Sequence, residues 1–173
     1  MYSKAEILSL IELRQSTIKD WLSCPLMFRF RHVLKLDPSY RSLAALYGST
    51  LHLSIHRLHL DGFEQDLEML YDQALAEILE LESHIPIRWK TNEMADLASL
   101  RKHGKELLKG YVGNPDNYEC KLVYSELAFR LRIDGLELTG TLDQLRQNPD
   151  GSLELVDFKS GMQRPRKRAL RRD

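Results

Sequence analysis

Cysteine is scarce in this chain of 173 residues, whose two thiols are Cys24 and Cys120. Two thiols are too few for a disulfide framework or for the four ligands of an iron–sulfur cluster within the chain. Long apolar runs are also missing, and the N-terminus lacks the cationic, apolar and small-residue stretches of a signal peptide. We therefore expect no disulfide-stapled fold, no iron–sulfur cluster and no membrane span, and a location in the reducing cytoplasm.

Net positive charge is missing as well, because 25 Lys and Arg residues balance 25 acidic residues. The balance is uneven, since residues 164–173 contain six cations and one acid and residues 1–163 therefore carry a net charge of −5. The body of the chain thus lacks the basic footprint that is usual in nucleic-acid binders. The tail is either a solvated segment or a source of salt-sensitive DNA contacts, through Arg164, Arg166, Lys167 and Arg168.

Hydrophobic periodicity predicts a helical part followed by a strand part. Residues 1–112 are expected to be mainly helical, because apolar residues recur at helical spacing in three segments, namely 43–60, 63–82 and 91–111. Beyond residue 116 the pattern alternates, which predicts three strands, at 121–133, 136–146 and 153–159. Asp134-Gly135 is a favoured hairpin turn between the first two strands. The prediction is a single α/β domain over 1–173, with an antiparallel meander at 120–160 and a basic tail at 162–173.

Acidic side chains and one lysine interrupt the predicted strands. Alternation places Asp157 and Lys159 on one face of the third strand. If the strand register sets Asp143 opposite Asp157, with Glu126 nearby, three carboxylates share one surface. Carboxylates held together repel one another unless a cation lies between them, and oxygen ligands suit Mg²⁺ or Mn²⁺.

A metal beside a lysine is suited to attack on a phosphodiester, so this group predicts a metal-dependent nuclease. An isolated Asp-x-Lys is more often an exposed ion pair on an ordinary strand. Here Asp143 and Asp157 have apolar neighbours in the sequence, and an interior carboxylate needs a partner or a metal.

Histidines offer a second way to bind a metal. His52, His56 and His59 stand at i, i+4 and i+7 on the predicted helix 43–60, so one face presents three imidazoles, as a zinc site would. The simpler interpretation is a histidine whose ring is satisfied by ordinary hydrogen bonds. No acidic residue lies among the three, which favours a mixed site of His52 with aspartates over a three-histidine site.

Five pieces of the sequence follow one another as they do in a known nuclease family. They are Ser16…Trp21…Cys24-Pro25…Phe28, Gly48-x-x-x-His52, Glu126, Gly140-Thr-Leu-Asp143 and Asp157-Phe-Lys159-Ser-Gly161. Together they resemble the RecB-like branch of the PD-(D/E)XK nuclease superfamily, which includes CRISPR-adaptation exonucleases, over residues 16–161. The resemblance implies a restriction-endonuclease-like core and a DNA exonuclease of repair, recombination or defence.

The resemblance also implies a role for each site residue. His52, Asp143, Asp157 and the backbone carbonyl of Phe158 would hold Mg²⁺ or Mn²⁺. Lys159 would position the attacking water or stabilise the charged transition state, and Glu126 would support the site.

Two departures from the family pattern change the expected partners. Relatives continue with a helix that carries Gln-x-x-x-Tyr, which is missing here, and Gln163 does not replace it. The three C-terminal cysteines of cluster-binding relatives are also missing, so Cys24 is either a remnant ligand or a buried packing residue. These departures predict self-association or a protein partner that covers the missing elements. They also leave an alternative, a truncated or catalytically impaired nuclease-like module that binds DNA or a protein.

Overall fold

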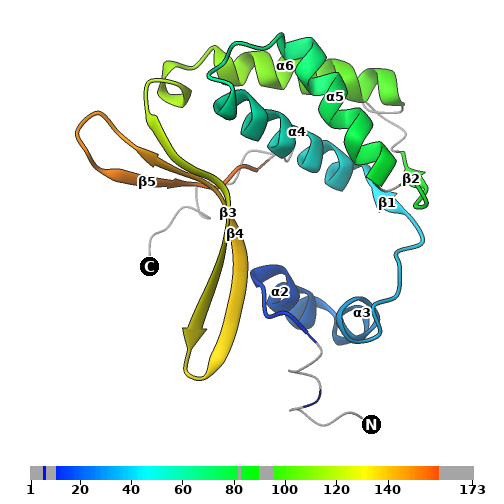
Figure 1. The fold of residues 1–173 in the computed structure, drawn as a ribbon. Coiled ribbons are helices and arrows are strands. Elements are labelled where there is room, and N and C mark those ends of the chain that lie inside the picture. The colour runs from blue at the N-terminus through cyan, green and yellow to red at the C-terminus, as the bar shows by residue number, and fades with distance from the viewer. Residues whose placement is uncertain (1–5, 7–10, 82, 90–95, 160–173) are drawn as a thin grey trace. The chain divides into compact units, whose positions relative to one another are not determined.

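The computed structural model describes residues 6, 11–81, 83–89 and 96–159 (Figure 1). These residues form two compact units, which the chain connects after residues 39, 120 and 157. Unit 1 contains the residues up to 39 together with 121–157. Unit 2 contains residues 40–120 and continues from Phe158. The single domain expected over 1–173 stays a prediction.

Unit 1 combines short helices with a three-stranded sheet in the order β3-β4-β5. Its elements are α2 (Gln15–Ser23), α3 (Pro25–Phe28), the π-helix η1 (Arg29–Val33), β3 (Lys121–Ile133), β4 (Leu136–Gln147) and β5 (Leu153–Val156). The segment before α2 is tied to the sheet, because the backbone N–H of Thr139 donates to the carbonyl of Leu13 at 2.8 Å. Both pairs of neighbouring strands are antiparallel, as the meander prediction required.

The hairpin of β3 and β4 shows why these residues form this turn and this pairing. Asp134 and Gly135 have φ values of 49° and 78°, so both adopt the positive φ that a two-residue turn of this kind requires. Phe129 lies opposite Gly140, and a Cβ atom at Gly140 would lie 2.5 Å from the Phe129 ring. Glycine is therefore needed at position 140 because an aromatic ring from the neighbouring strand covers it.

Unit 2 is a helical layer in which α4, α5 and α6 lie side by side (Figure 1). Its elements are β1 (Arg41–Ser42), α4 (Leu43–Leu60), α5 (Leu67–Leu81), β2 (Ile87–Arg88), α6 (Leu97–Val112) and η2 (Pro115–Asn117). The two short strands pair in parallel. The core contains eleven buried side chains from the three long helices, and Phe158 packs against it. Burial of this apolar area is the main term that holds the helices together.

Three helix starts differ from the sequence expectation. The helix expected from residue 63 begins at Leu67, because Gly62 and Phe63 both have positive φ and Asp66 accepts a hydrogen bond from the Met69 N–H at 2.8 Å. The last long helix is capped by Asp96, and residues 91–95, where its start was predicted, lie outside the described residues. Near the N-terminus, Ser16 is of a residue type that favours the N-cap position and would predict a helix after it, but the N-cap of α2 is Arg14.

The predicted fold class is confirmed as α/β, with helices followed by an antiparallel three-stranded sheet. Among the residues that the structure describes, no helix has both the length and the apolar character needed to cross a bilayer.

Candidate metal centre

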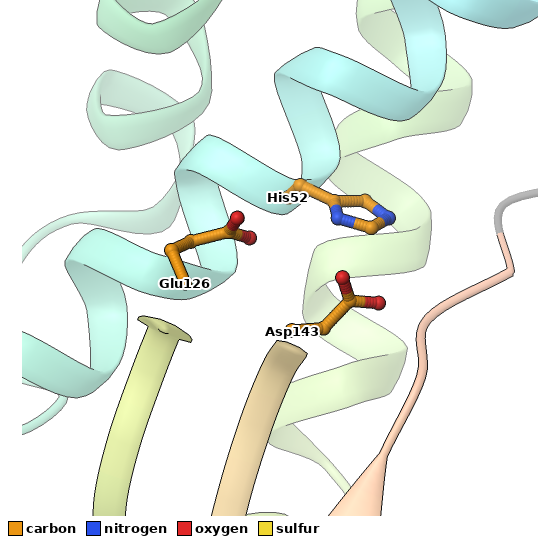
Figure 2. Close-up of side chains that lie close together, drawn as sticks. All are labelled: His52, Glu126 and Asp143. Atoms are coloured by element: carbon orange, nitrogen blue, oxygen red, sulfur yellow. The ribbon is translucent and has the colours of Figure 1, made fainter. Parts of the chain in front are cut away.

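Two carboxylates face each other across β3 and β4 in unit 1. The pairs Ser125–Gln144 and Leu127–Leu142 flank Glu126 and Asp143, so these two residues occupy opposite positions in the register. Opposite residues in antiparallel strands project from the same face of the sheet. A carboxylate oxygen of Glu126 lies within 4.8 Å of one of Asp143, and Figure 2 shows both side chains on their strands.

The backbone at Glu126 is unusual for a strand. Its φ is 52°, in the left-handed region, which costs a residue with a Cβ atom about 1–2 kcal/mol. Such conformations persist where the surrounding structure imposes them, and they concentrate at functional sites. The sequence carries no signal for this strain, because a glutamate does not favour positive φ.

Asp157 follows directly after the last residue of β5, Val156. The ladder between β4 and β5 ends with the pair Gln144–Val156, and one further step of this register would set Asp143 opposite Asp157. Asp157 is exposed and has no strand geometry. The described ladder thus places Glu126 opposite Asp143, and it ends one residue before Asp157.

The third strand is shorter than its sequence indicated. It was expected to reach Lys159, but β5 ends at Val156. The chain leaves unit 1 after Asp157, and Phe158 packs against the helical core of unit 2. Because β5 ends at Val156, alternation along a strand does not govern the directions of the Asp157 and Lys159 side chains.

His52 contributes an imidazole from α4 in unit 2. It is half-buried, and its Nε2 atom lies 3.2 Å from the carbonyl oxygen of Phe158. The two rings also make an edge-to-face contact, with centroids 5.9 Å apart. The chain thus brings His52 together with the carbonyl that the family resemblance assigns to a metal. Figure 2 draws the His52 side chain where it leaves its helix.

A cavity of about 420 Å³ in unit 2 lies beside this histidine. Its wall is mostly apolar and includes Leu51, Ile55 and Tyr111, and its polar groups come from His52, Glu106 and Lys159. The Tyr111 and Phe158 rings meet edge to face at 5.8 Å. An apolar cavity with a few polar groups is the usual form of a ligand site.

The three histidines of α4 do not act together. Among the described residues, no group of three potential metal-binding side chains includes His56 or His59. The Nε2 atom of His59 lies 2.6 Å from the Tyr111 hydroxyl, and its ring packs on Phe63. The hypothesis of a three-histidine zinc site is therefore not supported.

Other candidate residues fall in different places. Cys24 is exposed, not buried as a packing role would require, and it precedes Pro25 at the start of α3. Both cysteines are free thiols. The predicted DNA contacts lie in the basic tail, outside the described residues, at Arg164, Arg166, Lys167 and Arg168.

Comparison with known proteins supplies the family. A family model described as the PD-(D/E)XK nuclease superfamily matches residues 12–173, which include every residue of the candidate centre. Neither a curated protein nor a solved structure shows a significant match to the chain.

Proposed function

The chain belongs to the PD-(D/E)XK nuclease superfamily, and from this premise we propose that it is a Mg²⁺- or Mn²⁺-dependent deoxyribonuclease of the RecB-like branch. In this proposal it acts as an exonuclease in repair, recombination or defence, in the cytoplasm. The observation that carries the proposal is the pair of carboxylates, Glu126 and Asp143, whose oxygens lie within 4.8 Å of one another on neighbouring strands.

The donor set supports a divalent cation. Glu126 and Asp143 keep carboxylate oxygens within 4.8 Å, an arrangement that is repulsive without a positive charge between them. The family resemblance adds the imidazole of His52 to these two acids. Carboxylates with one imidazole and no thiolate suit Mg²⁺ or Mn²⁺ better than a structural zinc ion.

The covalent chain supports the inclusion of Asp157 and Phe158. Consecutive Cα atoms are about 3.8 Å apart, so the Asp157 side chain starts next to the Phe158 carbonyl. That carbonyl already lies 3.2 Å from the His52 Nε2 atom, so the two atoms can serve one cation. We therefore propose His52, Asp143, Asp157 and the Phe158 carbonyl as ligands, with Glu126 as a further carboxylate of the centre.

Lys159 and the wall of the cavity would assist the metal in phosphodiester hydrolysis. A bound cation would lower the pKa of a coordinated water and polarise the phosphate oxygens. Lys159 carries its ammonium one residue beyond Phe158 and lines the same cavity as His52. We propose that it orients the attacking water and stabilises the charge that develops on the phosphate. The apolar wall of the cavity would exclude other water from these groups.

The test is cleavage of end-labelled single- and double-stranded DNA by this chain in Mn²⁺, in Mg²⁺ and in EDTA. We expect metal-dependent release of short products from the ends, and Lys159→Ala and Asp143→Asn should lower kcat by a factor of at least about 10². Lys121→Ala is the matched control, because Lys121 is an exposed lysine on β3. Metal-dependent activity that survives in both site variants would show that another protein or another site is responsible.

A specific observation favours a second function, that of a nuclease-like module which binds a partner without cutting. Leu153 and Leu155 on β5 are 65% and 66% exposed, and within the described sheet this strand pairs on one side only. Exposed apolar side chains on an edge strand favour association with another chain, or with a second copy of this one. Stable complexes without any metal-dependent cleavage would support this alternative.

A further inference from the structure

Unit 1 contains a second cavity, which is lined by several cations and includes no residue of the proposed metal centre. It has a volume of about 580 Å³ and lies between residues 11–17 and residues 31–35. Its charged and polar lining comprises Glu12, Arg14, Ser16, Thr17, Arg31, His32 and Lys35. Three permanent cations face Glu12, and Asp20 pairs with Arg31 from outside the lining, so a surplus of one positive charge remains with His32 neutral, whereas residues 1–163 as a whole are acidic.

Two carboxylates, Glu12 in the lining and Asp20 outside it, pair with two of these cations. The Oδ2 atom of Asp20 accepts hydrogen bonds from Arg31 at 3.2 Å and from His32 at 3.0 Å. The hydrogen bond from His32, followed by that from Arg31, lowers the pKa of Asp20 against the effect of its partial burial. Glu12 holds Arg14 through two hydrogen bonds, at 3.0 and 2.6 Å. The pairing with Asp20 orients Arg31 and His32 before any ligand arrives, which lowers the entropy cost of binding, whereas Glu12 competes with a ligand for Arg14.

The backbone that presents the other wall is irregular. Arg31 and His32 lie on a π-helix, Arg29–Val33, and π-turns are frequent at functional sites. Lys35 follows it with a φ of 49°, in the left-handed region. Among the residues that the structure describes, no carboxylate pairs with the Lys35 ammonium. Lys35 is thus a cation of this cavity that is available to a ligand.

We propose that this cavity binds a backbone phosphate of the nucleic-acid strand, at a position other than the phosphate that is hydrolysed. The proposal rests on the nuclease function proposed above, which makes the substrate a polyanion. Arg, Lys and Ser side chains are the usual donors to backbone phosphates, and all three types line this cavity. Contacts of this kind hold a strand in place without reading its sequence. The cavity would therefore position the strand and contribute to KM.

The experiment measures binding of a fluorescent single-stranded oligonucleotide to the full chain by anisotropy, without divalent metal, at several salt concentrations. Arg14→Gln and Lys35→Gln should each weaken binding by about tenfold, the value of one charge-assisted hydrogen bond. Each should also reduce the slope of log K against log salt by about 0.7. Lys19→Gln and Arg29→Gln are the matched controls, because both residues are exposed cations of unit 1 outside the cavity lining.

Glu12→Gln provides a test of opposite sign. Removal of the one carboxylate in the lining releases Arg14 and raises the positive charge of the cavity, so binding of the oligonucleotide should tighten. Equal effects of cavity and control variants, or weaker binding by Glu12→Gln in a protein that melts normally, would overturn the proposal. A third result would also overturn the proposal. If inorganic phosphate saturates the cavity but Lys35→Gln does not change oligonucleotide binding, the cavity is a site for free anions.

Failure of this proposal can be told apart from failure of the nuclease function. Hydrolysis of the small diester bis(p-nitrophenyl) phosphate by the wild-type chain in Mn²⁺ reports on the metal centre alone. If neither this diester nor DNA is hydrolysed, the nuclease function is rejected. The anisotropy measurements with the cavity variants would still test whether the cavity binds the oligonucleotide. Where DNA is cleaved, the cavity variants should raise KM for DNA by about the factor by which they weaken binding.

Discussion

The contact between α5 and α6 behind the cavity of unit 2 gives the sharpest prediction of stability. A Cβ atom at Gly104 would lie 2.0 Å from Cζ and 2.1 Å from Oη of Tyr71, far inside the normal contact distance of about 3.5–4.0 Å. Tyr71 is fully buried, so its ring has no free space into which it can move. Gly110 on the same helix is exposed and has nothing within 4 Å of its Cβ position. The two glycines therefore form a matched pair.

The expected effects of alanine at these positions have opposite signs. Gly110→Ala should raise the free energy of unfolding by about 0.5–1 kcal/mol, because alanine is the better helix former. Gly104→Ala gains the same term but must overpack the core, which costs about 1–3 kcal/mol or more. A clash of 2.0 Å with a fully buried ring belongs at the upper end of that range. The two variants should thus differ by about 2–3 kcal/mol.

Thermal melting followed by far-UV circular dichroism measures this difference, since α4, α5 and α6 contribute most of the described helix. For a chain of this length, about 1 kcal/mol corresponds to 2–4 °C in Tm. Tyr71→Leu should destabilise the wild type by itself, yet it should recover part of the loss in the Gly104→Ala background. Shifts of the same sign and size for both glycines would refute the packing argument, as would strict additivity of the Tyr71 and Gly104 variants.

The remaining predictions concern the metal centre and acid stability. Without metal, Asp143→Asn should leave Tm unchanged or raise it, because the substitution removes repulsion with Glu126. Mn²⁺ should raise the Tm of this variant less than that of the wild type, and equal metal-induced shifts would show that Asp143 is not a ligand. Glu126→Gly should be more stable than Glu126→Gln by about 0.5–1 kcal/mol in urea unfolding, because glycine accepts the φ of 52° without strain, and the reverse order would show that no strain is stored there. His59→Ala should leave Mn²⁺ affinity in isothermal titration nearly intact, while His52→Ala weakens it; similar losses would revive the three-histidine site. The pKa of Asp20 is lowered in the folded state, so Asp20 stabilises the fold above its unfolded pKa of about 3.9 and this contribution disappears as the pH falls through its folded value. Asp20→Asn should therefore cost stability at pH 7 and much less near pH 3 in urea unfolding; an equal cost at both pH values would contradict this linkage.

Glu126 and Asp143 also show how far a strand pattern can predict a site. Alternation alone selects the residues that share a face of one strand, and the register then decides which of them meet across strands. Here the Asp134-Gly135 turn sets the register of β3 and β4, so the opposition of Glu126 and Asp143 follows from local turn chemistry. The turn before β5 sets the register of β4 and β5 in the same way, and in it the Asn148 N–H donates to the Ser152 carbonyl at 2.9 Å.

The sequence by itself determined the helices and strands that depend on interactions between neighbouring residues. Helical spacing of apolar residues predicted α4 with its observed bounds, Leu43–Leu60, and alternation with a favoured turn predicted β3 at Lys121–Ile133. These features depend on residues within a few positions of one another, so no distant part of the chain can easily change them. The family motifs likewise lie within short segments, and the match over residues 12–173 confirms the superfamily to which they point.

Only the tertiary structure decided where local preference gives way to distant contacts. The third strand stops at Val156, and two residues later Phe158 packs on a helical core formed by residues 43–108. Glu126 adopts a positive φ that no glutamate prefers, and Arg14 meets Arg31 and Lys35 around one cavity although about twenty residues separate them. Each of these outcomes depends on contacts between residues that are far apart in the sequence. A pattern of neighbouring residues cannot predict such contacts.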